Sequence, residues 1–193
     1  MQSRPEGPYF VLGTGRCGTS TVARILHEHF KIPMALDEDR LRKFHHTNPD
    51  GAYEDWDIYN MNRWFIDGKI GIREWLALCD SHILARKRKW KGQPWGWKDI
   101  PSTTFMGLML LFFDEPPRII RCMRDRRLVL KSMVKNFVQT RSDAEYQHDS
   151  GIIQLDRILQ YIPHLVIDFG SEQRSDEWVI KQIEERWPDI WGN

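Results

Sequence analysis

The chain has 193 residues, of which 41% are hydrophobic, and this is enough to bury the core of one domain. Its 28 basic and 27 acidic side chains give a net charge of +1, so the composition gives no reason to expect a nucleic-acid partner. No apolar run is long enough to cross a bilayer, and the N-terminal residues lack the apolar core of a signal peptide. We therefore expect a single domain over residues 1–193, without stable membrane insertion.

The chain has three cysteines, and none of them forms a CxxC pair: Cys17, Cys79 and Cys122. This number and spacing indicate free thiols in a reducing compartment, and not a disulfide framework or a zinc site. We therefore expect a cytoplasmic protein.

The hydrophobic pattern predicts short strands and helices in alternation. Strands are expected at residues 9–13, 93–99, 117–125 and 164–169. Helices are expected at residues 19–30, in two pieces within 54–90 divided near 67–71, and at 102–112, 127–140, 152–161 and 176–187. This alternation is typical of an α/β fold, here a three-layer α/β/α arrangement with a central parallel sheet. Ligands of such sheets bind at the carboxyl ends of the strands.

Two polar stretches are expected to be loops, at residues 36–51 and 141–151. Pro49 and Gly51 interrupt the first of them. Because acceptor pockets are commonly built from variable segments, we expect residues 31–49 and 141–150 to gate the site and to contact the acceptor.

The stretch "GTGRCGTST" (residues 13–21) follows the first predicted strand and leads into the first predicted helix. Its glycines, Gly13, Gly15 and Gly18, allow the backbone to turn tightly and to point its N–H groups inward. The helix that starts at Thr19 adds the positive end of its dipole. The sequence therefore predicts a phosphate-binding loop that begins with a strand and ends with a helix.

This loop differs from the ATP-binding form GxxxxGK[ST] in the position of its cation. When the two are aligned on Gly13 and Gly18, the lysine position holds Thr19 and the next position holds Ser20. A cation is present as Arg16, two residues before Gly18. This arrangement favours a ligand whose transferable group is carried on a single 5′-phosphate.

A second anion site is predicted where the third strand ends. Arg124 lies at the end of that strand, and Ser132 follows eight residues later, two turns into the next helix. An arginine at a strand end and a hydroxyl from the following helix can together clamp a second phosphate.

Together these motifs resemble the sulfotransferase family, whose members use 3′-phosphoadenosine-5′-phosphosulfate (PAPS). The resemblance rests on a loop of the form G-x-x-[KR]-x-G-T-[ST], followed downstream by R-x-P-x-x-x-x-x-S. "NPDGAYEDWDIYNMN" (residues 48–62) is similar to the NPxGYxE segment of many bacterial-type members, and "WGWKDIPST" (residues 95–103) to their GWKDPR strand end. "HLVIDFGSEQRSDEWVIKQI" (residues 164–183) is similar to their late strand and helix.

The resemblance implies which residues hold the donor. The 5′-phosphosulfate is implied to lie against Arg16, Gly18, Thr19 and Ser20, and the 3′-phosphate against Arg124 and Ser132. The predicted cofactor-binding residues are therefore Gly13, Gly15, Arg16, Cys17, Gly18, Thr19, Ser20, Arg124 and Ser132. The expected product is adenosine 3′,5′-bisphosphate, and no metal is required.

Several positions depart from the family pattern. Arg126 stands where proline usually follows R-[DN], and Ile100 separates Asp99 from Pro101. Thr21 stands where cytosolic members carry a tryptophan that stacks on adenine, and their catalytic histidine would fall near Ile100. The chain is thus nearer the bacterial type, and its adenine recognition and its base have to be argued from its own residues.

Sulfuryl transfer requires stabilisation of the leaving 5′-phosphate, an acceptor placed in line and a base for its proton. We assign Arg16 and the loop N–H groups to the first task, with Lys98 assisting. Glu54 is the favoured base, because the resemblance implies a glutamate near the acceptor, and Asp99 is the alternative. In a purely structural interpretation, Glu54 is a helix N-terminal acid, and Lys98 and Asp99 form a surface ion pair.

The sequence thus favours a sulfotransferase that acts on a hydroxyl or amine of a small-molecule, glycan or lipid acceptor. Two alternatives stay open: a P-loop kinase or NTPase with a displaced cation, and a catalytically inactive remnant that binds a nucleotide or a partner. The missing loop lysine argues against the kinase. The sulfotransferase hypothesis predicts binding of adenosine 3′,5′-bisphosphate without magnesium, whereas the kinase hypothesis predicts magnesium-dependent turnover of ATP.

Overall fold

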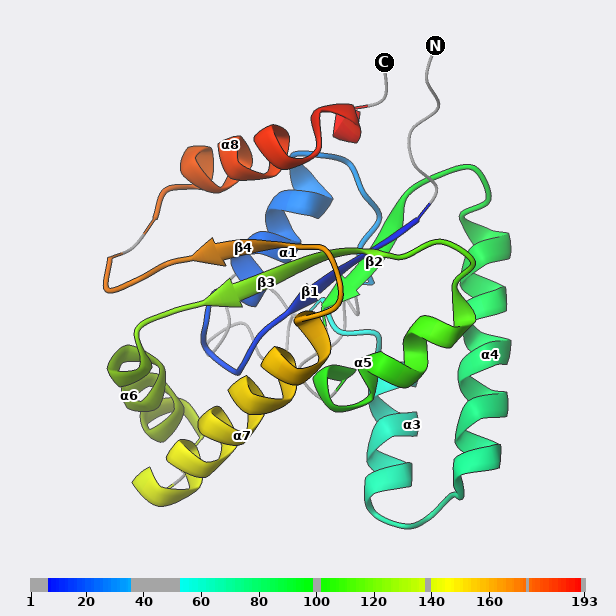
Figure 1. Cartoon of the computed structure of the whole chain (residues 1–193), viewed down its shortest axis with the longest axis horizontal. Helices are drawn as coiled ribbons and strands as arrows, with labels where there is room; N and C mark the ends of the chain where they lie inside the picture. Colours follow the sequence, from blue (N-terminus) through cyan, green and yellow to red (C-terminus); the bar gives the residue numbers. More distant parts are fainter. Residues whose placement is uncertain (1–6, 36–52, 99–101, 138–139, 173, 192–193) are drawn as a thin grey trace.

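The computed structural model describes residues 7–35, 53–98, 102–137, 140–172 and 174–191. Strands and helices alternate along this part of the chain (Figure 1). The strands are β1 (Pro8–Leu12), β2 (Trp95–Lys98), β3 (Arg118–Met123) and β4 (His164–Asp168). The helices are α1 (Thr19–Glu28), α3 (Trp56–Ile66), α4 (Ile72–Lys89), α5 (Ser102–Met109), α6 (Arg126–Phe137), α7 (Arg141–Leu159) and α8 (Asp176–Arg186), with 3₁₀ turns η1 (Leu110–Phe112) and η2 (Pro188–Trp191).

The described strands form one parallel sheet in the order β2-β1-β3-β4. Val11 of β1 lies opposite Lys98 of β2, and Met123 of β3 lies opposite Asp168 of β4. Because the strands are parallel, their carboxyl ends meet at one edge of the sheet, and the segments that follow them lie there together. The predicted parallel α/β sheet is confirmed.

The central strand β1 is buried along its whole length, as is typical of a parallel sheet covered on both faces. Tyr9 and Val11 pack into a core with residues of α1 and α8, whereas Phe10 and Leu12 pack into a second core with residues of α3, α4, α5 and α7. Figure 1 shows α1 and α8 on one side of the sheet and α5 and α7 on the other. The predicted three-layer arrangement is therefore confirmed.

One expected loop is a helix. Residues 141–151 begin α7, whose start is fixed by a capping box: Thr140 Oγ1 accepts from the Asp143 N–H, and the Asp143 carboxylate accepts from the Thr140 N–H. Ala144 and His148 are buried one turn apart and continue the inward face that Leu155 and Leu159 complete. The polar residues around them are exposed or half-buried, and their abundance led to the wrong prediction of a gating loop.

Most other expected elements are present. The two helices within residues 54–90 are α3 and α4, and residues 102–112 form α5 followed by η1. The expected loop at residues 36–51 lies outside the described residues, as does most of the segment 31–49 that was expected to contact the acceptor. Within the described ranges, no helix is both long and apolar enough to cross a membrane.

Candidate functional site

The predicted phosphate loop joins β1 to α1 at the carboxyl edge of the sheet. Two of its residues have a left-handed backbone, Arg16 with φ 70° and Gly18 with φ 94°. A Cβ atom at Gly18 would lie 2.4 Å from the ring of Phe169, and one at Gly13 would lie 2.4 Å from the Cys17 sulfur. Glycine is therefore required at both positions by close contacts, and at Gly18 also by the backbone turn.

Two side chains of the loop face its interior. Cys17 is 1% exposed, and its thiol donates to the carbonyl oxygen of Thr14 at 2.7 Å. Burial raises the pKa of Cys17 to about 12, so the helix N-terminus beside it does not produce a reactive thiolate. Thr19, at the lysine position of an ATP-binding loop, is also buried. Cys17 thus fills the inside of the loop.

Helix α7 supports the loop from outside. A Cβ atom at Gly151 would lie 3.1 Å from the methyl group of Thr14, and Thr14 is itself buried. The residues that were expected to form a gate therefore belong to a helix whose backbone packs against the phosphate loop.

The structure brings the two predicted anion sites together. Arg16 Nε donates to Ser132 Oγ at 2.9 Å, although the two residues are 116 positions apart in sequence. Asn136, one turn further along α6, donates to the same oxygen at 3.1 Å. Burial, and then the nearby charge of Arg124, lower the pKa of Arg16. Because the two guanidinium groups repel each other, a phosphate or sulfate bound near both would relieve this repulsion.

Lys98 joins the loop to the segment before α3. Its side chain is 3% exposed, and its ammonium group donates to Ser20 Oγ at 3.1 Å and contacts Glu54 Oε1 at 2.5 Å. Lys98 reaches the loop because it lies opposite Val11, next to the end of β1. The alternative of a surface ion pair is therefore wrong for Lys98, which is buried and pairs with Glu54. Asp99 lies outside the described residues.

Glu54 lies two residues before α3, and its side chain is 13% exposed. The cap of α3 is Asp55, whose Oδ1 accepts from the backbone N–H groups of Asp57 and Ile58. The role of helix N-terminal acid thus belongs to Asp55 and not to Glu54. Among the described residues, Glu54 Oε2 is buried and has no hydrogen-bond partner.

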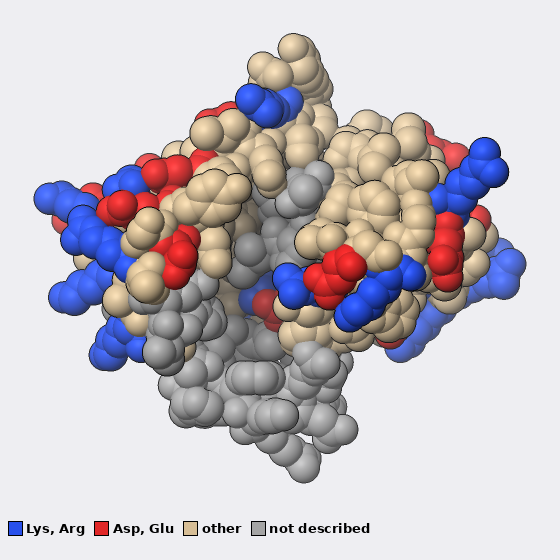
Figure 2. Space-filling view, turned by 90° about the horizontal axis from the view of Figure 1, so that it is seen from below, with Lys and Arg blue, Asp and Glu red and all other residues tan. Residues whose placement is uncertain are grey.

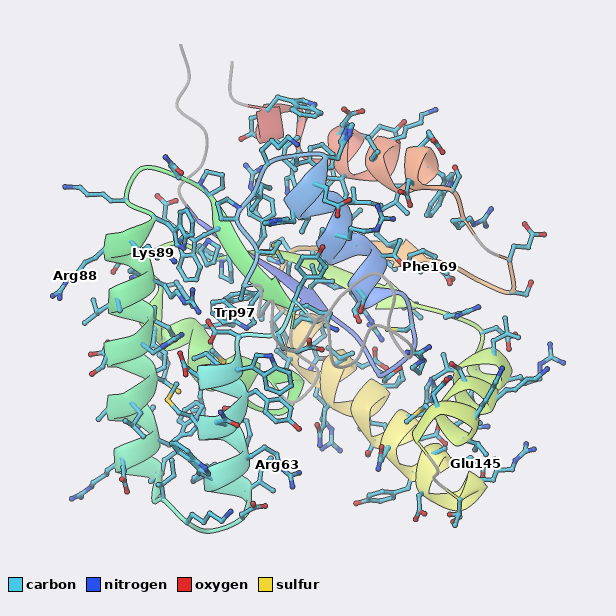
Figure 3. The ribbon with its side chains drawn as sticks, turned by 180° about the vertical axis from the view of Figure 1, so that it is seen from behind. Arg63, Arg88, Lys89, Trp97, Glu145 and Phe169 are labelled. Atoms are coloured by element: carbon cyan, nitrogen blue, oxygen red, sulfur yellow. The ribbon has the colours of Figure 1, made fainter. Side chains whose placement is uncertain are left out.

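A cavity of about 300 Å³ lies beside the loop. It is lined by arginines from three elements: Arg24 of α1, Arg124 after β3 and Arg174 before α8. Phe169, which follows β4, adds an aromatic ring next to the start of α1 (Figure 3). The other lining residues are Gly18, Thr21, Glu172 and Asp176. Such a cavity suits a ligand with an anionic group and a flat ring.

Sequence reasoning missed Arg24, Phe169 and Arg174. Phe169 directly follows a strand at the carboxyl edge, and this position was a signal that could have been used. Arg24 donates to both oxygens of Asp176, at 2.9 and 2.8 Å, and thereby joins α1 to the start of α8. No pattern in the sequence distinguishes Arg24 or Arg174 from other polar residues of the surface.

A group of possible metal ligands lies near Glu54. Single ligand atoms of Asp55, Asp57 and His82 lie within 4.8 Å of one another. However, Arg86 Nη2 lies 2.9 Å from Asp55 Oδ2, so a guanidinium group already neutralises the buried carboxylate. We therefore interpret the group as an anchor between helices.

Figure 2 views the molecule from below, and its surface is hollowed on this side. In Figure 1 the helices α3, α4, α6 and α7 lie toward this side. Two groups of side chains flank the hollow, and charged atoms of both signs lie inside it (Figure 2).

No family model matches the chain, and no curated protein matches it in sequence. The solved structures that are similar to it include two with 14% sequence identity each. One is an uncharacterized protein from Eubacterium ventriosum, with a TM-score of 0.52 over 94% of this chain and 100% of that one. The other is described as "a putative kinase" from Chloroflexus aurantiacus, with a TM-score of 0.48 over 95% of this chain and 98% of that one. At this identity the likeness concerns the fold alone, a parallel sheet flanked by helices.

Proposed function

We propose that the protein transfers a sulfuryl group from PAPS to a hydroxyl or amine of an acceptor. The observation that carries this proposal is the 3.1 Å hydrogen bond from the Lys98 ammonium to Ser20 Oγ. In an ATP-binding loop the hydroxyl at this position binds Mg²⁺. Here the buried Lys98 at the end of β2 lies next to that hydroxyl, so a side-chain cation is already present at this place. A phosphosulfate carries less charge than a triphosphate and is suited to a site with side-chain cations alone.

In this proposal the donor spans the two anion sites. The 5′-phosphosulfate lies against the loop near Arg16 and Lys98, and the 3′-phosphate lies near Arg124 and Ser132. The hydrogen bond from Arg16 to Ser132 supports this placement, because residues of the two predicted anion sites are then in direct contact. The adenine then enters the cavity beside Phe169, whose ring substitutes for the tryptophan that Thr21 replaces.

The chemistry follows from these positions. The acceptor oxygen or nitrogen attacks sulfur, the bond between sulfur and the 5′-phosphate oxygen breaks, and that oxygen leaves with the electron pair. Arg16, Lys98 and the loop N–H groups stabilise the charge that develops on the leaving oxygen. Glu54 Oε1 stays with Lys98, while Oε2 accepts the proton of the acceptor. Asp99 is the alternative base.

Phosphoryl transfer from ATP is the second candidate function, favoured by the GxxxxG spacing and the hydroxyl of Ser20. It would require this hydroxyl to bind magnesium. The ammonium of Lys98 opposes a second cation at that place by charge repulsion. A third possibility, a catalytically inactive remnant, would bind the same nucleotide and transfer nothing.

Calorimetry with adenosine 3′,5′-bisphosphate in the presence of EDTA tests the proposal. We expect binding that is lost or weakened in Arg124→Ala, and no comparable binding of ATP with magnesium. Labelled PAPS offered with a panel of glycans, lipids and phenols then identifies the acceptor class. Magnesium-dependent ATP turnover without binding of the bisphosphate would instead favour the kinase.

A further inference from the structure

The chain is anchored on both sides of Glu54. Before Glu54, the carbonyl oxygen of Tyr53 accepts from the Lys98 N–H at 2.8 Å, and the Tyr53 side chain is buried. After Glu54, the side chain of Asp55 is 1% exposed. The residue proposed as the base therefore sits between two fixed neighbours, one tied to β2 and one tied to the helices.

Asp55 makes more contacts than a helix cap requires. Its Oδ1 accepts from the N–H groups of Asp57 and Ile58 at 3.2 and 3.4 Å, which is the whole of the cap. Its Oδ2 lies 2.9 Å from both His82 Nε2 and Arg86 Nη2, which belong to α4. A serine would cap α3 as well as Asp55 does. The second oxygen of Asp55 therefore serves the link to α4.

The charge of Asp55 makes this link strong. Burial by itself would raise the pKa of Asp55, but the hydrogen bond with His82 and the charge of Arg86 outweigh it and lower the pKa. His82 is held in turn, since its Nδ1 lies 3.6 Å from Asp57 Oδ2. A buried carboxylate is costly without partners, so the position of Asp55 is bound to that of His82 and Arg86.

We infer that Asp55 is a positioning residue, which through His82 and Arg86 fixes Glu54 beside Lys98. The inference rests on the proposed function, because it takes Glu54 as the base of the transfer. Helix α4 then determines where the proton-accepting oxygen lies. Arg88, two residues after Arg86, points outward from the same helix and takes no part (Figure 3).

A double-mutant comparison tests this role. Asp55→Ser keeps a cap for α3 and removes the oxygen that contacts α4. We expect kcat for transfer from PAPS to fall about tenfold to a hundredfold, since a small misplacement of a catalytic group has an effect of this size. The Kd for adenosine 3′,5′-bisphosphate should stay unchanged. In the Glu54→Gln background, the same substitution should have no further effect on kcat, because the group it positions is gone.

A second variant separates positioning from folding. Arg86→Gln removes one partner of Oδ2 without touching the cap, and we expect a smaller fall in kcat in the same direction, again absent in the Glu54→Gln background. Arg88→Gln is the matched control on the exposed side of α4, and it should change neither kcat nor the melting temperature.

The possible outcomes are distinguishable. If Asp55→Ser lowers kcat equally in the unmodified and Glu54→Gln backgrounds, the inference is overturned while the proposed function stands. Loss of bisphosphate binding in Asp55→Ser would also overturn it, since Asp55 would then support the whole site. If the unmodified protein neither binds the bisphosphate nor transfers from PAPS, the proposed function fails, and this inference fails with it.

Discussion

The two sides of the candidate site differ in how their charges are balanced. On the donor side, Arg16 donates to the neutral Ser132 and lies near a second guanidinium, that of Arg124. On the acceptor side, two cations face buried carboxylates: Lys98 pairs with Glu54, and Arg86 with Asp55. In the proposed function an anion completes the donor side, whereas the two ion pairs of the acceptor side form without a ligand.

Lys98→Ala is the substitution with the largest expected effect, because Lys98 serves both sides. Ser20 would lose a donor, Glu54 its ion-pair partner, and the leaving phosphate a nearby charge. We expect kcat for transfer to fall about a hundredfold or more. We also expect the free energy of unfolding to drop by about 3–5 kcal/mol, since a buried charge loses its partner.

Transfer assays with labelled PAPS and urea denaturation measure these two effects of Lys98→Ala. Lys89→Ala is the control, because Lys89 is an exposed lysine of α4. A kcat unchanged in Lys98→Ala would show that the leaving group does not depend on this cation.

Arg124→Ala perturbs the donor side alone. We expect the affinity for adenosine 3′,5′-bisphosphate to fall about tenfold to a hundredfold, the range for a charge-assisted hydrogen bond. The affinity for adenosine 5′-monophosphate, which has no 3′-phosphate, should change little. Calorimetry compares the two ligands, with Arg127→Ala as the control because the Arg127 side chain is 88% exposed. An equal loss for both ligands would contradict a specific role toward the 3′-phosphate.

Gly18→Ala tests the shape of the donor side. The new methyl group would stand 2.4 Å from the Phe169 ring at a residue with φ 94°, so we expect a loss of about 1–3 kcal/mol in the free energy of unfolding. Combining it with Phe169→Ala removes the steric part, and the double variant should lose less than the two single losses added together. Simple additivity in denaturation experiments would show that the ring is not what excludes a side chain.

Cys79→Ala has the smallest expected effect, because it removes only one of three buried thiols, which are Cys17 in the loop, Cys79 on α4 and Cys122 in β3. Burial raises the pKa of Cys17 and Cys79 to about 12 and raises the pKa of Cys122 well above its usual value, and the charge of Asp55 adds to the shift at Cys79. Unfolded thiols titrate near pH 8.5, so above about pH 9 the unfolded chain loses protons that the folded chain keeps. Stability should therefore be full at lower pH and fall by up to about 1.4 kcal/mol per pH unit for each thiol between about pH 9 and 12.

Urea denaturation at about pH 8, 9 and 10 measures this decline. Cys79→Ala should make the slope shallower, because one of the three titrating thiols is then absent. An unchanged slope in that variant would mean that Cys79 is not one of the buried acids responsible.

The sheet could be predicted because each strand is a short apolar run followed by polar residues at a parallel sheet's carboxyl edge. The loop could be predicted because its glycines and hydroxyls are contiguous. The contact between Arg16 and Ser132 could be suspected only through a family resemblance, since its partners are 116 residues apart. The pairing of Lys98 with Glu54 was not foreseen, because the adjacent Asp99 offered a nearer partner in sequence.

The helical start of α7 was missed for a different reason. Its first turns bury only Ala144 and His148, so the apolar spacing is too sparse to outweigh the polar residues between them. The one available signal was the capping box of Thr140 and Asp143, in which aspartate takes the place of the more usual glutamate or glutamine. The cavity beside the loop was also missed, since its lining comes from several segments that only the fold brings together.

The contact between Gly151 and Thr14 has a consequence for how such a loop can change. The glycines of the loop allow its backbone to turn, but the loop also packs against α7. A Cβ atom added at Gly151 of this helix would lie only 3.1 Å from the methyl group of Thr14. A side chain added at Gly151 would press on Thr14 and require it to move by a few tenths of an ångström, with no change in the loop's own residues. A change at Gly151, more than 130 positions after Thr14, can therefore alter the shape of the loop, although the loop's own sequence, which a comparison of binding motifs records, stays the same.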